Sequence, residues 1–266
     1  MPLTNIEAIL DDDFPKSDKN CMFQCALEEG DCEVLKTYIK KYGKTPYRME
    51  GVIYDAIQYN RGEIIHLLLE FGADVNEIYS DGFTLLHIAA QYGACRTLFP
   101  LIFAGAKLDS KNDHGWTPLH YAAASDFVAT DLIGILLDFG ANIDPVNNAG
   151  YTPIFEAMDL IGHQKEAISN VQYLLARGAN IHARLPDGST LLHVAADALN
   201  YINEVYTGEM LSICRLLIER GLSICDLRND GASVLSICHT SAAVAALEKI
   251  SFESKFLHAP PATHKF

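Results

Sequence analysis

A fixed interval of twelve residues is the feature that most constrains how this chain can fold. A glycine is followed twelve residues later by a threonine or serine in five pairs: Gly72 and Thr84, Gly105 and Thr117, Gly140 and Thr152, Gly178 and Thr190, and Gly221 and Ser233. The distance from each threonine to the next glycine instead grows along the chain, from 21 to 23, 26 and 31 residues. Self-similarity at a period of about 20 to 50 residues indicates a repeat architecture. The link between repeats is therefore constant, and length is added only inside a repeat.

The stretch from Asp113 to Asn147 shows what one repeat contains. Thr117 can cap a helix through its hydroxyl, and Pro118 is tolerated at the first helical position because its missing N–H has no partner there. A second apolar stretch follows and ends at Gly140, which suits a left-handed residue beyond a helix end. Neither helix can bury its apolar face alone. The sequence therefore predicts helical pairs that stack on their neighbours.

The repeated segments resemble the ankyrin repeat family. The resemblance rests on DGFTLLHIAA, HGWTPLHYAAA, AGYTPIFEAM and DGSTLLHVAA, with LLLEFGADVN, LLDFGANID and LLARGANIH closing repeats. It implies an all-α solenoid in which each repeat is a β-turn finger followed by two antiparallel helices, with about seven units including degenerate caps. It also implies that His87, His120 and His193 tie the start of the first helix by hydrogen bonds rather than serve metal or proton chemistry.

We expect three parts along the chain: a leader at 1–19, a repeat domain at 20–250 and a tail at 251–266. The repeats are expected at 20–49, 50–80, 81–112, 113–147, 148–186, 187–229 and 230–250. A polar outer face on the first repeat suits a cap. The last repeat is shortened, and Val244, Leu247 and Ile250 need covering. We expect the segment from Phe252 to Leu257 to fold back over them.

The formal net charge of −14 bears on the class of partner. Nucleic acids and anionic membranes attract basic surfaces, so we expect neither as a partner. A protein with a basic surface fits better, while the excess acid is equally well explained as an aid to solubility. The chain has no run of about 18 apolar residues, and its odd number of cysteines suits a reducing compartment. We expect a monomeric, cytoplasmic protein, placed in the host cytosol if a pathogen secretes it.

The candidate partner-binding surface begins with three aromatic residues that directly precede the threonines: Phe83, Trp116 and Tyr151. The constant link is expected to place them in a row on adjacent fingers. The family binds partners through finger tips and the exposed edge of the first helices, which adds Ile78, Asp81, Lys111, His114, Val146 and Asn148. A second group is expected to line the concave side: Gln91, Tyr92, Ser125, Asp159 and Asp197. The alternative is that the aromatic rings pack on one another and on the fingers for stability alone.

The later repeats carry insertions, which are either binding equipment or tolerated drift in a surface turn. One alternative function follows from them. In it, residues 148–229 form a small ligand or catalytic pocket that uses Cys214, His163, Asp159 or Glu204.

Glycine-rich phosphate loops, HExxH, GxSxG and paired CxxC motifs are all missing from the sequence. Cys21, Cys25 and Cys32 have no histidine nearby and fit no usual zinc spacing. We therefore expect no catalysis, no metal and no cofactor. The first hypothesis is a protein–protein interaction module that acts as an adaptor, an inhibitor or a secreted pathogen effector.

Overall fold

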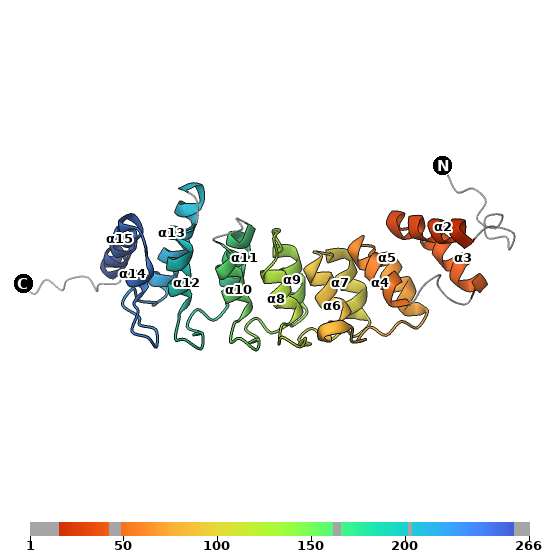
Figure 1. Ribbon diagram of the computed structural model, residues 1–266, viewed down its shortest axis with the longest axis horizontal. Helices are drawn as coiled ribbons and strands as arrows, with labels where there is room; N and C mark the ends of the chain where they lie inside the picture. The colour runs from red at the N-terminus through yellow and green to blue at the C-terminus, as the bar shows by residue number, and fades with distance from the viewer. Residues whose placement is uncertain (1–15, 43–48, 162–165, 202–203, 258–266) are drawn as a thin grey trace, which may run out of the picture. The chain divides into compact units, whose positions relative to one another are not determined.

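The structure is a computed structural model that describes residues 16–42, 49–161, 166–201 and 204–257. The described residues form helices and turns, and the helices follow one another in pairs (Figure 1). Among these residues the only β-type pairing is an isolated bridge between Leu227 and Ser233. The Cα atoms group into two compact units, which we describe separately. Unit 1 comprises residues 1–122 with 134–141, and unit 2 comprises residues 123–133 with 142–266.

Unit 1 is built from three successive helical pairs. These are α2 (Lys16–Glu29) with α3 (Cys32–Tyr42), α4 (Met49–Gln58) with α5 (Gly62–Glu70), and α6 (Leu85–Gln91) with α7 (Cys95–Phe103). The first helix of one pair packs on the first helix of the next, as α4 does on α6, and α5 packs in the same way on α7. The next pair, α8 (Pro118–Ala123) and α9 (Thr130–Asp138), is divided between the two units.

Unit 2 repeats this arrangement with helices of less regular length. Its helices are α10 (Pro153–Leu160), α11 (Glu166–Ala176), α12 (Leu191–Ala198), α13 (Glu204–Glu219), α14 (Val234–Ile237) and α15 (Ser241–Leu257). Here α10 packs on α12, and α15 packs on α13. The insertion in the sixth repeat appears as a second helix, α13, of 16 residues. The added length has therefore lengthened the second helix of a pair.

Five loops, here called fingers, join the second helix of one repeat to the first helix of the next. In each finger a backbone N–H donates to the carbonyl four residues later, at 2.8–2.9 Å: Tyr79 to Phe83, Asn112 to Trp116, Asn147 to Tyr151, Leu185 to Ser189, and Arg228 to Ala232. In the first finger, Asp81 and Gly82 both have positive φ, of 57° and 75°, as a type I′ turn requires. The same backbone bond in all five fingers explains why the link has a constant length.

A threonine and a histidine fix the start of the first helix in three repeats. The backbone N–H of Thr84 donates to Nδ1 of His87 at 3.0 Å, and Thr117 with His120 and Thr190 with His193 repeat this bond at 3.1 and 3.2 Å. Nδ1 of His87 accepts a hydrogen bond, so the imidazole proton is on Nε2. Nε2 donates to the Trp116 carbonyl at 3.0 Å. Burial lowers the pKa of His87, so the ring is neutral at pH 7. The expected structural role is thus what the geometry shows.

The fifth repeat lacks this histidine and shows what it supplies. Phe155 stands in its place and is fully buried. The buried hydroxyl of Thr152, at the helix start, then has no hydrogen-bond partner. A buried polar group without a partner carries a desolvation penalty of about 1–3 kcal/mol.

The two ends differ from the sequence prediction. Helix α2 begins at Lys16, inside the expected leader, and α15 runs through residue 250 to Leu257. The expected fold-back of the segment from Phe252 to Leu257 is therefore wrong. Phe252 is 64% exposed, whereas Leu247 and Ile250 are buried on the face of α15 that packs against α13. No glycine or proline lies between Ser241 and Leu257 to end the helix.

Gly62, the first residue of α5, lies where the backbones of two neighbouring pairs in unit 1 approach closely. A Cβ atom at this position would lie 2.2 Å from the carbonyl oxygen of Arg96 and 2.9 Å from its carbonyl carbon. Both are backbone atoms of α7 and cannot turn aside as a side chain would. The packing of α5 on α7 therefore requires glycine here.

We predict that Gly62→Ala lowers the free energy of unfolding by about 2–3 kcal/mol, because the added methyl group overpacks a backbone contact. Urea denaturation followed by circular dichroism measures this change. Gly208→Ala is the matched control: Gly208 is helical with nothing within 4 Å of the added Cβ, so that variant should gain about 0.5–1 kcal/mol. Equal effects of the two substitutions would contradict the close-approach explanation.

Candidate partner-binding surface

Phe83 and Trp116 lie at the base of consecutive fingers in unit 1, and both are half-buried. The ring of Tyr121 lies between them, with its centroid 5.2 Å from that of Phe83 and 4.9 Å from that of Trp116. Asn112 holds Tyr121 from the finger by donating its amide to the phenol oxygen at 2.9 Å. These aromatic residues therefore join neighbouring repeats and also leave part of each ring at the surface. Tyr121 was not among the sequence-predicted residues, because it occurs at this position in one repeat only.

The predicted finger-tip residues are all exposed. Ile78 and Val146 present large apolar side chains, which are 73% and 47% exposed. The polar members of this group are Asp81, Lys111, His114 and Asn148. Because they are exposed, these residues are available to a partner. Their role in binding stays a prediction.

The concave group divides into exposed and buried members. Gln91, Asp159 and Asp197 are exposed, and so is Tyr92, whose ring packs edge-on against Tyr54 at 5.6 Å. Ser125 does not belong to this surface, because it is only 6% exposed.

The hydroxyl of Ser125 donates to the Phe127 carbonyl and accepts from the amide of Asn170. Asn170 is wholly buried and also accepts the backbone N–H of Ala129 at 2.9 Å. The serine is thus enclosed by a residue 45 positions further along the chain, which repeat periodicity does not reveal.

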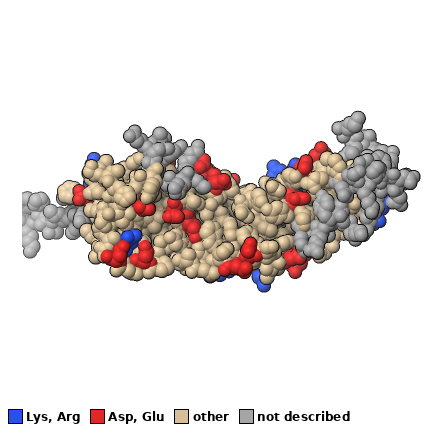
Figure 2. Space-filling view, in the orientation of Figure 1, with Lys and Arg blue, Asp and Glu red and all other residues tan. Residues whose placement is uncertain are grey.

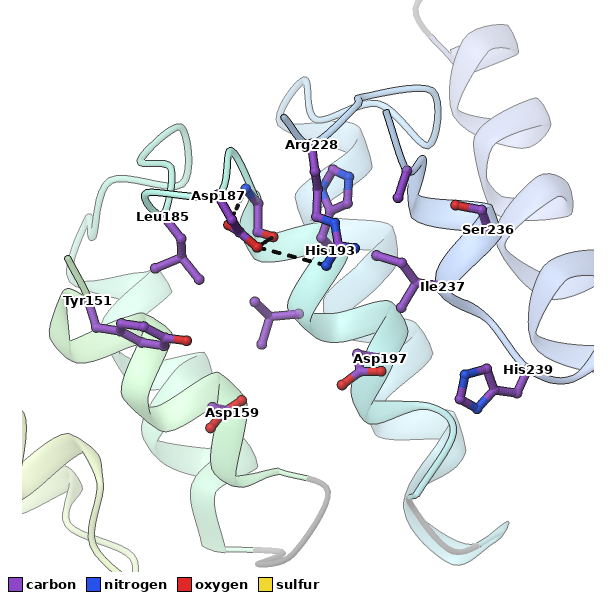
Figure 3. Close-up of a pocket in the computed structure, with 13 residues that line it drawn as sticks. Tyr151, Asp159, Leu185, Asp187, His193, Asp197, Arg228, Ser236, Ile237 and His239 are labelled. Atoms are coloured by element: carbon purple, nitrogen blue, oxygen red, sulfur yellow. Dashed lines mark hydrogen bonds and ion pairs between the residues drawn. The ribbon is translucent and has the colours of Figure 1, made fainter. Parts of the chain in front are cut away.

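A cavity of about 400 Å³ opens within unit 2, and Tyr151 stands at one side of it (Figure 3). Leu185, Val194 and Ile237 provide apolar wall. The carboxylates of Asp159, Asp187 and Asp197 and the cation of Arg228 face the same space, with His239 at its edge. The cavity therefore combines aliphatic and aromatic walls with an excess of acid.

The acidic groups of this cavity differ in whether they are already paired. Arg228 lies 2.8 Å from the carboxylate of Asp230 and 3.8 Å from that of Asp187. By contrast, no described Lys or Arg side chain forms an ion pair with Asp159 or Asp197. Acidic side chains also outnumber basic ones on the face shown in Figure 2. The charges of the cavity therefore favour a positively charged group.

Glu156, close to this cavity, titrates far from its ordinary range. Burial raises its pKa to about 7 from an ordinary 4.5, and the Asp159 charge adds to this. The amide of Asn147, which donates to Glu156 at 2.6 Å, opposes the shift. Burial followed by the Asp159 charge also raises the pKa of Tyr151. Negative charge is thus crowded on this side of unit 2.

The structure does not bring Cys214 into a pocket with Asp159, as the alternative function requires. Cys214 is completely buried, and burial raises its pKa to about 12. Its thiol does not line the cavity that contains Asp159. His163 and the side chain of Glu204 lie outside the described residues. Within the described part of the chain, no group of three or more His, Cys, Asp or Glu residues could hold a metal ion.

Comparison with known proteins identifies the family. A sequence model of ankyrin repeats, in three copies, matches residues 22–112 and again residues 86–184. The chain belongs to the ankyrin repeat family. A solved ankyrin repeat domain, that of Bcl-3, described as a unique member of the IκB protein family, superposes with a TM-score of 0.65 and 22% identity. The match covers 85% of this chain and 97% of the solved one. The expected all-α ankyrin-repeat fold is thereby confirmed.

Curated relatives with similar ankyrin repeats come from several kinds of protein. The mouse B-cell lymphoma 3 protein homolog is 29% identical over 139 residues, which are 50% of this chain and 30% of the relative. A channel subunit of Caenorhabditis elegans, the transient receptor potential subfamily A member 1 homolog, is 34% identical over 193 residues, 70% of this chain and 14% of the relative. A putative ankyrin repeat protein of fowlpox virus is 29% identical over 153 residues, 53% of this chain and 44% of the relative. The chain thus spans less than half the length of each.

Among the helices that the structure describes, every one is too short or too polar to cross a lipid bilayer.

We predict a pH-dependent contribution of Glu156 to stability. Its folded-state pKa is raised, so its contribution is complete below about pH 4.5 and is lost as the pH rises through about 7. Glu156→Gln keeps an acceptor for Asn147 and carries no charge. The melting temperature of the variant should therefore rise relative to the wild type between pH 5 and pH 8.5. A melting-temperature difference that is constant across this range would show that Glu156 is not the titrating group.

Proposed function

We propose that this chain is a non-catalytic ankyrin repeat module that binds another protein through its fingers and concave face. The observation that carries the proposal is the cavity of unit 2, in which Asp159 and Asp197 stand beside Tyr151 and Leu185. A lysine or arginine side chain fits this combination, because its aliphatic stem packs on apolar walls while its charged head meets the carboxylates. We therefore assign a basic segment of the partner to the cavity.

The fingers supply the second part of the proposed contact. The exposed portions of Phe83 and Trp116 lie next to exposed tip residues in unit 1, and their rings are already fixed by Tyr121. A surface that is ordered before binding loses less conformational entropy on association. Aromatic residues also tend to dominate the energy of protein interfaces.

The excess of acid supports a protein partner over nucleic acid or an anionic membrane, which bind basic surfaces. We propose a monomeric protein of the cytoplasm, or of a host cytosol if it is a secreted effector. An adaptor and a stoichiometric inhibitor both need only such a binding surface. Affinity capture from a cell extract, followed by mass spectrometry, provides the partner for the two tests below.

We predict that the double substitution Asp159→Asn and Asp197→Asn weakens partner binding at least tenfold, because each carboxylate loses a charge-assisted hydrogen bond worth about 1.5–3 kcal/mol. Titration calorimetry at two salt concentrations measures the affinity and its salt dependence, which should also decrease. Glu209→Gln with Glu248→Gln removes the same charge from exposed positions of unit 2 outside the cavity. If this control pair loses as much affinity, net charge rather than the cavity governs binding.

The finger aromatics require a separate test. Trp116→Ala and Phe83→Ala should each weaken partner binding at least tenfold while the chain remains folded at the assay temperature. Phe71→Ala is the matched control, since Phe71 is a partly exposed aromatic residue of unit 1 at the end of α5 rather than on a finger. Unchanged affinity of both finger variants would reject the finger site and leave the cavity prediction standing.

A further inference from the structure

Unit 1 carries an exposed apolar cluster on the second helices of its pairs, on elements other than the fingers. It consists of Phe99 and Phe103 of α7 and Phe139, which follows the end of α9; we call it the outer aromatic cluster. Their side chains are 42%, 75% and 39% exposed. The ring centroids lie 6.4, 6.0 and 5.6 Å apart, so the three rings form one contiguous surface.

The repeat pattern does not account for Phe103. It stands two residues before Gly105, whereas the same position holds Glu70 before Gly72 and Asp138 before Gly140. The neighbouring repeats therefore place a carboxylate where this repeat places the most exposed of the three rings. Burying a phenylalanine stabilises a fold by about 1.5–3 kcal/mol, and Phe103 contributes little of this because three-quarters of it remains in water.

A groove adjoins the cluster and shares Phe103 as a wall. It has a volume of about 360 Å³ and lies between α5 and α7, lined by His66, Leu69, Glu70, Pro100, Phe103 and Ala104. Leu69, Pro100 and Phe103 make most of its surface apolar. A groove between two parallel rows of side chains accepts the side chains of a third helix, as ridges do in helix packing.

The electrostatics around the cluster select the kind of helix. Helices α5, α7 and α9 end at Glu70, Phe103 and Asp138, so three helix C-termini are next to the cluster and the groove. Each C-terminus carries a partial negative charge of about half an elementary charge. None of these three helices has a basic residue in its last turn. Lys107 follows in the loop beyond α7, and His66 lies 3.5 Å from Glu70.

We propose that the outer aromatic cluster and its groove bind an amphipathic helix of a partner protein, with leucine or aromatic residues on its apolar face and lysine or arginine along its rim. The three rings and the groove match the apolar face. Glu70, Asp138 and the helix C-termini match the basic rim. An anionic lipid surface is repelled by the same groups. This site is on other elements than the fingers and the cavity, so the chain could hold two proteins at once.

The test uses a labelled synthetic helix of about 18 residues, roughly five turns, composed of leucine and lysine. Fluorescence anisotropy should show saturable binding to the wild type, and Phe103→Gln should weaken it at least tenfold. Phe103→Gln places a polar side chain at the repeat position that Glu70 and Asp138 occupy in the neighbouring repeats. The thermal unfolding of this variant should therefore match that of the wild type. Phe252→Gln changes another largely exposed phenylalanine, on α15 and outside the fingers and the cavity, and should leave the affinity unchanged.

Two further arms separate this site from the alternatives. The double substitution Asp159→Asn and Asp197→Asn removes the lysine contacts proposed for the cavity of unit 2. In that background the leucine–lysine helix should still bind, and Phe103→Gln should still weaken it at least tenfold. Binding that no longer depends on Phe103 would overturn the proposal. A leucine–glutamate helix should bind at least tenfold more weakly, and equal binding would overturn the charge match. Binding of the wild type to phosphatidylcholine vesicles that Phe103→Gln abolishes would assign the cluster to lipid and overturn the proposal. Self-association that Phe103→Gln abolishes would assign it to a second copy of the chain and overturn the proposal as well.

Discussion

The hydrogen bond from a threonine backbone N–H to a histidine Nδ1 is the interaction on which the repeat geometry depends. It fixes the histidine tautomer, and in the case of His87 it directs Nε2 to the carbonyl of Trp116 on the next finger. One buried, neutral imidazole thus bonds both to the start of its own helix and to the finger of the following repeat. The backbone bond that closes each finger then fixes the loop length. The unpaired hydroxyl of Thr152 beside Phe155 shows the same position without the histidine.

Because the fingers fix the stacking, variation in length collects elsewhere in each repeat. The sixth repeat uses its insertion to extend α13 to 16 residues, and the last pair ends in α15, which is 17 residues long. These long second helices leave the backbone bond that closes each finger unchanged. An insertion that disturbed the finger would break the backbone bond and misplace the next threonine, so only the far edge tolerates growth.

The sequence predicted the features that local chemistry dictates. The finger glycines, the capping threonines and the buried histidines follow from backbone requirements that a residue type reveals directly. The errors concern contacts that local chemistry does not encode. Ser125 was expected at the surface, but Asn170 reaches it from the following repeat. The segment after Ile250 was expected to fold back, yet an uninterrupted helical pattern and packing on α13 keep α15 continuous. Arg228 and His239 were missed at the cavity because they come from different loops.

Periodicity and exposure together separate aromatic residues that hold the repeats together from those with surface left over. Phe83 and Trp116 recur in register and are half-buried because Tyr121 packs between them, so part of their energy is already used in joining repeats. Phe103 breaks the register, replaces a carboxylate and remains three-quarters exposed. A side chain that neither the repeat pattern nor the core requires must be explained by something outside the fold. The departure from the repeat is therefore a stronger indication of a binding role at Phe103 than the repeat itself is at Phe83.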